Sequence, residues 1–206
     1  MSNFKGELNS HISTARIEAL SDGVFAIAMT LLVLDLNVPN LAGTVSNQQL
    51  SQALWQIWPN VFAFVLAFLL LGNAWAVHHR QFALIQKWDD RFVMINTLRL
   101  LIVVCIPFTT SLIAHYGNLT SGALPFATNF FLLAMASYWQ WDYAIKHNLI
   151  GSVSARSKKL GRQKSLFAAL VAILAMLTSL VAPAISPAVF MLNFMAEPVL
   201  EKINHE

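Results

Sequence analysis

The chain has 206 residues, of which 57% are hydrophobic and only 11% are charged, and its mean hydropathy is +0.59. A water-soluble domain carries about 25% charged residues, so the composition excludes an ordinary soluble protein and indicates a protein of the lipid bilayer. The formal net charge is only +3, and a single cysteine, Cys105, excludes an internal disulfide framework.

Six segments are expected to cross the membrane as α-helices. A helix needs about 20 mainly apolar residues, with a range of about 17–25, to span the hydrocarbon core. The segments are 15–36, 54–77, 92–115, 124–145, 165–182 and 187–200. The sixth depends on a helix start at Ser186-Pro187. Residues 1–13 lack the pattern of a cleaved signal, so we expect the first segment to be retained. We therefore predict an all-α integral membrane protein with one domain over residues 1–206.

The basic residues predict the orientation of these helices. The links 37–53, 116–123 and 183–186 contain no Lys or Arg. Nearly all the basic residues lie before or at the start of the first segment, in the other links or after the sixth: Lys5, Arg16, Arg80, Lys87, Arg91, Lys146, Arg156, Lys158, Lys159, Arg162, Lys164 and Lys202. Under the positive-inside rule, both termini are cytoplasmic. The run between the fourth and fifth segments is expected to be a solvated loop beside lipid, and nucleic-acid binding is less favoured.

The polar residues do not form a recognisable catalytic motif. His78 and His79 are adjacent, so their rings point to different sides of a helix, and no HExxH spacing accompanies them. The sequence also lacks a GxSxG serine motif and a glycine-rich phosphate loop. We therefore expect neither an enzyme nor a metal site.

Polar residues within or next to the expected spans gather at the cytoplasmic ends of these spans. They are Arg16, Ser21, Asp22, His78, His79, Asn96, Arg99 and Asp142. Opposite charges at one depth can pair, and pairing offsets the cost of burying them. A structural clasp between the helices is favoured over a proton relay, because a relay needs ionisable groups spread across the membrane.

An apolar stripe follows the polar residues of the first segment. Ile27, Leu31 and Leu34 lie on one helix face, with Thr30 beside them. Ordinary helix packing explains such a stripe, so periodicity alone identifies no transport path. Asp35, near the expected outer end, has two equally favoured interpretations: one member of a ring of acidic charges that attracts cations, or the solvated end of a helix.

Several motifs resemble those of a known channel family. Arg16-x-x-x-Leu20-Ser21-Asp22 resembles the Arg-x-x-x-Phe-Ser-Asp signature of the TMEM175 family of potassium channels, in its prokaryotic branch. The likeness covers about residues 12–115, with Leu20 in place of the usual Phe, a change that affects local packing. Further similar motifs are Trp75-x-x-His78-His79-x-x-Phe82, Asn96-x-x-x-Leu100 and Ile106-Pro107-Phe108.

The resemblance implies a homotetramer in the bacterial plasma membrane, with a central pore lined by four copies of the first helix. Ile27 would then form the narrowest ring, Leu31 and Leu34 would form further apolar rings, and Thr30 would offer oxygen nearby. The remaining motif residues would form a structural polar network outside the ion path: Arg16, Ser21, Asp22, His78, His79, Asn96 and Arg99.

The function implied by the resemblance is passive conduction of monovalent cations with a preference for potassium. The partners would be membrane lipid, other copies of the chain and the permeant potassium ion, with no cofactor and no nucleic acid. Two alternatives stay open at this point: a secondary transporter coupled to ions or protons, and a membrane scaffold that transports nothing. A transporter would favour internal repeats and helices broken near the midplane, and no repeat is visible in the sequence.

Overall fold

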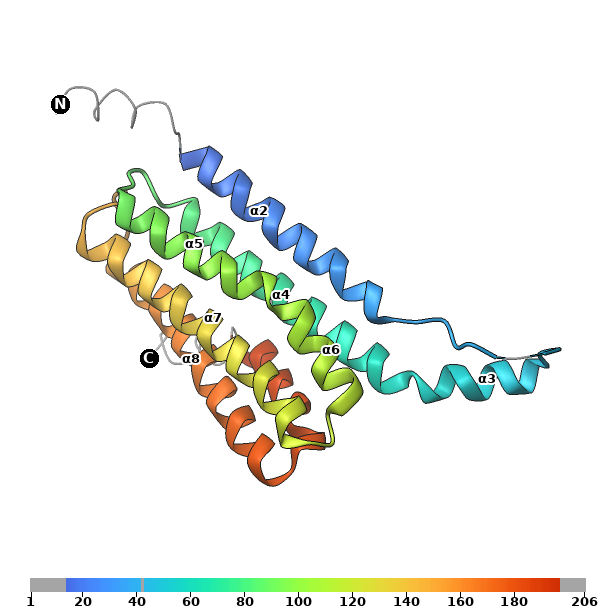
Figure 1. Cartoon of the computed structure of the whole chain (residues 1–206). Helices are drawn as coiled ribbons and strands as arrows, with labels where there is room; N and C mark the ends of the chain where they lie inside the picture. The colour runs from blue at the N-terminus through green and yellow to red at the C-terminus, as the bar shows by residue number, and fades with distance from the viewer. Residues whose placement is uncertain (1–13, 42, 197–206) are drawn as a thin grey trace.

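The computed structural model describes residues 14–41 and 43–196, and this part of the chain is helical throughout apart from its links (Figure 1). Four helical stretches are long and apolar enough to cross a membrane: Thr14–Asp35, Trp58–Phe82, Asp90–Tyr116 and Ala155–Val181. They agree with the first, second, third and fifth segments expected from the sequence. The all-helical membrane fold is thereby confirmed, whereas the six-span count and the sides of the termini stay predictions.

The first described helix, α2 (Thr14–Leu31), continues into a short 3-10 turn, η1 (Leu32–Asp35). One face of α2 packs against helices α4 and α5. The buried positions follow helical spacing: Ile17, Ser21, Phe25, Ala28 and Leu32. Burial on one side only means that the opposite side of α2 has no cover within the described chain.

A short helix that the sequence analysis had assigned to a loop precedes the second long helix. It is α3 (Asn47–Gln56), and it begins with a capping box in which Ser46 and Gln49 satisfy each other's backbone amides. A break at Ile57 separates α3 from α4 (Trp58–Phe82). Pro59 explains the break, because proline lacks an N–H and its ring clashes with the carbonyl four residues earlier. The expected span 54–77 thus begins too early and ends too early.

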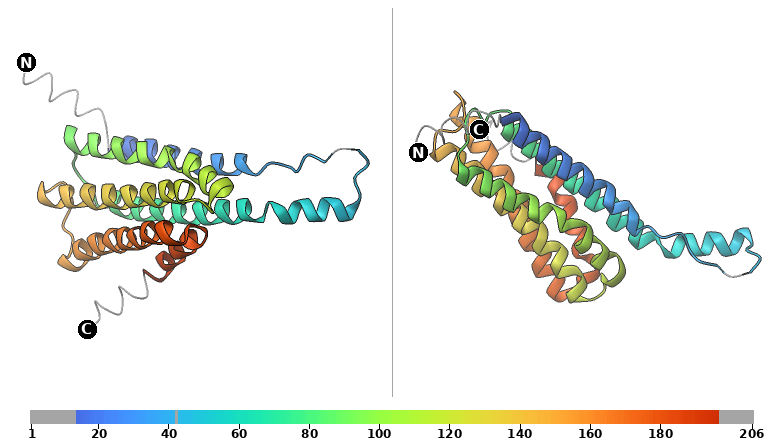
Figure 2. Two further views of the ribbon diagram at one scale, coloured as in Figure 1. Left: turned by 60° about the horizontal axis from the view of Figure 1, so that its bottom comes forward. Right: turned by 45° about the horizontal axis from the view of Figure 1, so that its top comes forward.

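Helix α3 extends beyond the ends of the other helices in both views of Figure 2, on the same side as the turn after α6. The other end of the bundle carries Arg80, Lys87, Arg91 and the start of α8, and is called the basic end below.

The third expected segment forms two helices in succession, α5 (Asp90–Val104) and α6 (Ile106–Tyr116). The carboxylate of Asp89 caps α5 by accepting a hydrogen bond from the Phe92 amide at 2.7 Å. The junction lies at Cys105, two residues before Pro107. Pro107 occupies the first turn of α6, where its missing N–H costs little.

Two long antiparallel helices, α7 (Thr120–Lys146) and α8 (Ala155–Val181), form the other side of the bundle. The basic run expected to be a loop is helical, and this corrects the prediction: Arg156, Lys158, Lys159, Arg162 and Lys164 belong to the first turns of α8. Lys and Arg are good helix formers, and Ser154 caps the helix by accepting from the Ser157 amide. An ion pair between Arg162 and Asp142 ties this part of α8 to α7.

The sixth expected span, 187–200, is described only as far as residue 196. Three short helices follow one another: η2 (Pro183–Ile185), α9 (Ser186–Val189) and η3 (Phe190–Met195). Together they form an apolar stretch of Pro183–Met195, below the length needed to cross a bilayer. The remainder of the expected segment, 197–200, lies outside the described residues, as do both chain ends.

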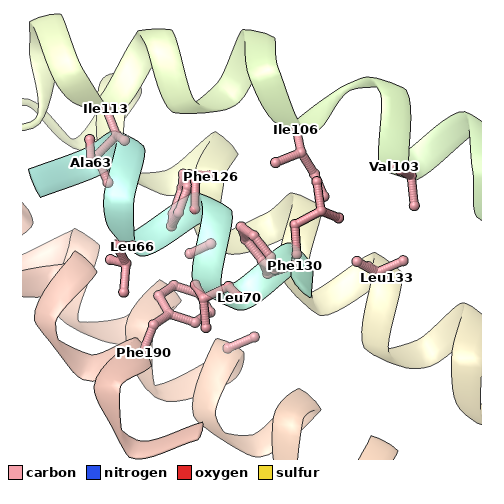
Figure 3. Close-up of a cluster of buried hydrophobic side chains, with 14 of the residues drawn as sticks. Ala63, Leu66, Leu70, Val103, Ile106, Ile113, Phe126, Phe130, Leu133 and Phe190 are labelled. Atoms are coloured by element: carbon pink, nitrogen blue, oxygen red, sulfur yellow. The ribbon is translucent and has the colours of Figure 1, made fainter. Parts of the chain in front are cut away.

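Aromatic side chains anchor this final segment to the bundle (Figure 3). Phe190 meets Phe126 edge to face at a centroid distance of 5.5 Å, and meets Phe130 at 5.4 Å. Leu66 and Leu70 of α4 belong to the same buried cluster. A second apolar cluster closes the basic end: Ile17, Phe82, Ile85, Phe92, Trp141, Ala144 and Leu149.

Candidate functional site

The outward face of α2 and of the η1 turn that continues it, called the outward face of α2 below, carries the residues expected to line an ion path. Ile27 is 59% exposed, Leu31 44% and Leu34 70%, and Thr30 is exposed between them. All four lie opposite the buried side that includes Phe25 and Leu32. The structure therefore places the expected pore residues on one uncovered face of a helix, though it contains no second copy of the chain.

Small and polar residues lie on this same face. A side chain added at Gly23 would meet nothing within 4 Å, so packing inside the described chain gives no reason for a glycine there. The Thr30 hydroxyl donates to the Ile27 carbonyl at 2.8 Å, which leaves the lone pairs of its oxygen available to an ion or to water. Small residues typically allow helices of neighbouring chains to approach closely.

A chain of buried hydrogen bonds crosses the bundle behind α2. Asn96 of α5 donates to the Ser21 hydroxyl at 3.0 Å, and Gln140 of α7 donates to the Asn96 side-chain oxygen at 3.0 Å. Arg99 then donates to the Gln140 oxygen at 2.9 Å and contacts Nδ1 of His78 at 2.9 Å. Because a guanidinium can only donate, Nδ1 of His78 is the acceptor. Four helices are thus joined by one polar network at a single depth.

A second set of polar contacts fixes the exposed edge between α2 and α4. The indole N–H of Trp75 donates to Asp22 at 2.8 Å, and Nδ1 of His79 lies 3.2 Å from a Glu18 oxygen. The Trp75 and His79 rings also stack, with centroids 5.7 Å apart. These contacts set the rotation of α2 about its own axis, and so decide which face points outward.

Arg16 is the one expected network residue that the structure leaves outside both sets of contacts. It is exposed near the start of α2, and no hydrogen bond or ion pair joins it to another of the residues that the structure describes. It precedes Ile27 by eleven residues, about three helical turns, and therefore lies on the same outward side of α2. Its assignment to the structural network has no support in the described chain.

Three contributors to these networks were absent from the sequence prediction: Gln140, Glu18 and Trp75. Trp75 belongs to a quoted motif but reads in the sequence as an aromatic at the membrane interface. A buried Gln within an apolar helix is an available signal for Gln140, since polar side chains in membrane helices tend to hydrogen-bond across helices. Its partners lie 41 and 44 residues away in sequence, so the pairing itself could not be predicted.

Asp35, at the end of η1, is held by α6. Ser111 donates to one of its carboxylate oxygens at 2.8 Å, and Nδ1 of His115 lies 3.8 Å from the other. The carboxylate is about a quarter exposed. Asp35 is therefore a fixed group rather than a freely solvated helix end.

No cluster of three or more potential metal ligands occurs among residues 14–41 and 43–196.

We expect replacement of Trp75 by phenylalanine to lower thermal stability modestly. Phenylalanine keeps an aromatic ring beside His79 but removes the donor to Asp22, and one such hydrogen bond contributes about 0.5–1.5 kcal/mol. For a chain of this length the melting temperature in detergent should fall by about 1–6 °C. An Asp22→Ala variant should lose a similar amount, and the double variant less than the sum of the two.

Trp139→Phe provides the matched control, because Trp139 is exposed and makes no hydrogen bond within the described chain. Equal melting shifts for Trp75→Phe and Trp139→Phe, or strictly additive effects of Trp75→Phe and Asp22→Ala, would contradict a stabilising bond between Trp75 and Asp22.

Comparisons with known proteins agree with the motifs. Residues 16–107 match the family model described as the endosomal/lysosomal potassium channel TMEM175. A potassium channel of Streptomyces collinus is 41% identical over 103 residues, 50% of this chain and 48% of the relative. A potassium channel of Chamaesiphon minutus is 45% identical over 103 residues, 50% of each protein. The matched segment therefore spans about half the length of these curated relatives.

A solved structure extends the likeness to almost the whole chain. The crystal structure of a Chamaesiphon minutus homologue of the lysosomal potassium-selective channel TMEM175 has a TM-score of 0.79 and 31% identity, covering 91% of this chain and 97% of the other. Together, the apolar helices and the solved structure define an all-helical, multi-pass transmembrane protein. The chain belongs to the TMEM175 family.

Proposed function

We propose that this protein is a passive, potassium-preferring cation channel that assembles as a homotetramer around four copies of α2. The observation that carries the proposal is the exposed face of α2, where Ile27, Thr30 and Leu34 have no cover within the described chain. Relatives that match the same half of the sequence are named potassium channels. The two sets of polar contacts support the proposal because they hold the opposite side of α2 against α4 and α5.

An apolar face exposed in a single chain can also contact lipid. Two features favour contact with other copies of α2 instead. Gly23 offers a close approach that nothing in its own chain uses, and Thr30 places a hydroxyl in the middle of the face. Small residues and Ser or Thr side chains are enriched where membrane helices pack together.

The proposed pore selects ions by dehydration at an apolar constriction. A ring of four Ile27 side chains supplies no oxygen to replace an ion's hydration shell, so a tight ring excludes water and closes the path. Conduction requires the ring to widen until a partly hydrated ion passes. Potassium holds its water less strongly than sodium and crosses more easily. The preference is modest, because no set of carbonyl oxygens is tuned to one ion.

Asp35 is proposed to lie at the outer mouth of this pore. Four such carboxylates would raise the local concentration of cations. The hydrogen bond from Ser111 supports the assignment because it fixes the carboxylate to α6 instead of leaving it to rotate freely in solvent.

The test is a measurement of ion flux on the purified protein in liposomes, together with its mass in detergent. A channel carries current down a potassium gradient without a coupled substrate, and the current persists when no proton gradient is present. The reversal potential in mixed potassium and sodium should show a moderate potassium preference. Four copies of a 22.9-kDa chain should give a protein mass of about 92 kDa.

Flux that requires a proton gradient or a second substrate would instead favour a coupled transporter. The absence of flux both with and without a proton gradient or second substrate would favour a membrane scaffold that transports nothing. A tetramer mass without any current would support the assembly and contradict conduction.

A further inference from the structure

Two adjoining cavities are lined by residues of α4, α7 and α8, and none of the residues that line them belongs to α2. The larger cavity also takes residues from α5 and η3. The larger has a volume of about 220 Å³ and the smaller about 160 Å³. Val77, Arg80 and Lys164 line both cavities. Arg80 is exposed, while Lys164 and Ala168 are only partly buried, so the larger cavity reaches the surface of the chain along this edge.

Arg99 gives the larger cavity a buried positive charge. Its side chain is 1% exposed, and its acceptors, the Gln140 oxygen and Nδ1 of His78, are both uncharged. Its Nε has no acceptor among the described residues. A buried charge that is not paired with an opposite charge is costly, so an anion in the cavity would offset the cost of burying this guanidinium.

A second buried donor lines the smaller cavity. Gln81 is 6% exposed, and its side-chain nitrogen has no hydrogen-bond acceptor within the described part of the chain. Arg80 and Lys164 add positive charge to the wall that the two cavities share. The unmatched groups in both cavities are donors, and donors beside cationic side chains suit the oxygens of a phosphate.

The larger cavity also has an apolar part of its wall, formed by Leu70, Phe130, Leu133 and Phe190. Uncharged polar residues line it as well: Asn73, Ser137, Ser165 and Asn193. An apolar wall favours contact with hydrocarbon over contact with water. The larger cavity therefore accommodates a hydrocarbon segment beside its charged end, which is the chemistry of an amphiphile.

We propose that these cavities bind an anionic phospholipid. Its phosphate lies among Arg99, Arg80 and Lys164, and the start of one acyl chain lies along the wall of Leu70 and Phe130. Basic pockets between transmembrane helices are a recurrent site for anionic headgroups. The site is separate from the proposed pore, so a chain that conducts no ions would still bind the lipid.

The test uses the full-length purified protein in detergent and measures bound lipid by native mass spectrometry and melting temperature during titration. The three probes are phosphatidylglycerol, phosphatidylcholine and inorganic phosphate. Phosphatidylglycerol should bind and raise the melting temperature, whereas the other two should do neither. Equal effects of phosphatidylglycerol and phosphatidylcholine would overturn the proposal. An effect of inorganic phosphate equal to that of phosphatidylglycerol would also overturn it, because the cavities would then be a simple anion site.

Two pairs of variants place the lipid in the cavities. Lys164→Gln should weaken phosphatidylglycerol binding about fivefold, whereas Lys159→Gln, an exposed change on the same helix outside both cavities, should leave it unchanged. Ala168→Phe fills the larger cavity and should abolish binding. Leu166→Phe, on the same helix but outside the cavities, should not.

The paired design keeps the result interpretable when a variant is unstable. A loss of binding with an unchanged melting temperature in lipid-free detergent supports the site. Equal loss in Lys164→Gln and Lys159→Gln would show general attraction of lipid to the basic end and would overturn the proposal, as would unaltered binding to Ala168→Phe.

Discussion

Replacement of Ile27 by alanine is expected to raise potassium flux several-fold and to weaken the preference for potassium over sodium. The change removes a branched side chain from each of four helices at the proposed narrowest ring. A wider ring admits more water and lowers the cost of partial dehydration. A decrease of about 1.4 kcal/mol in the barrier corresponds to a tenfold faster passage. The flux of sodium should rise by a larger factor than the flux of potassium, because dehydration costs more free energy for sodium.

The measurement is a comparison of currents and reversal potentials for wild-type and Ile27→Ala protein at equal protein density in bilayers. Ile173→Ala is the matched control, because Ile173 is also exposed but lies on α8. If both variants behave like the wild type, Ile27 is not the constriction. If both raise flux equally, the change reflects looser packing of the bundle and not a wider pore.

The same model predicts an order of effects along α2. Leu31→Ala and Leu34→Ala should raise flux less than Ile27→Ala, because these residues form wider rings in the proposed pore. A larger effect at Leu34 than at Ile27 would move the narrowest point toward Asp35 without removing the pore from α2.

Helices with clear hydrophobic patterns could be predicted from the sequence, and their ends could not. Pro59 divides an apolar stretch into α3 and α4, and the expected span 54–77 crosses that division. A transmembrane span is predicted from the mean hydropathy of about twenty residues. The end of a helix depends instead on a single proline or a single capping residue. The same limit explains α8, where the cap at Ser154 begins a helix among charged residues.

The depth of the polar network in the membrane, and some of its residues, could be predicted from the sequence. The sequence placed Ser21, Asn96 and Arg99 at one depth, and the structure joins them through Gln140. The connection through α7 depends on how α5 and α7 pack, which no short motif encodes. Arg16 lies more than one helical turn before Ser21 on α2 and is exposed, so it does not reach the network.

For the apolar stripe on α2, the members could be predicted from the sequence but their surroundings could not. Its spacing in the sequence indicates one helix face but not what covers that face. The chain buries Phe25 and leaves Ile27 exposed, and this difference is tertiary information. Periodicity alone did not identify the stripe as a candidate ion path. The family resemblance did, and the exposure of Ile27 supports that candidate.

Replacement of Arg99 by methionine is expected to destabilise the protein by about 2–4 kcal/mol. The variant keeps much of the aliphatic volume but leaves the Gln140 oxygen and Nδ1 of His78 without their donor. Each orphaned buried acceptor costs about 1–3 kcal/mol. The opposing term is relief from burying a guanidinium, which is smaller for arginine than for lysine because a guanidinium is more weakly hydrated.

This prediction is checked by thermal unfolding in detergent, where a loss of 2–4 kcal/mol corresponds to a melting temperature roughly 5–15 °C lower for a chain of this length. Arg91→Met is the control on the same helix. Arg91 is exposed, so its replacement should change stability by less than about 0.5 kcal/mol. An Arg99→Met protein that melts with the wild type would mean that burial of the charge costs as much as its hydrogen bonds contribute. The network would then set the rotation of α2 without stabilising the fold. Its role for Ile27 would be limited to keeping that side chain on the outward face of α2.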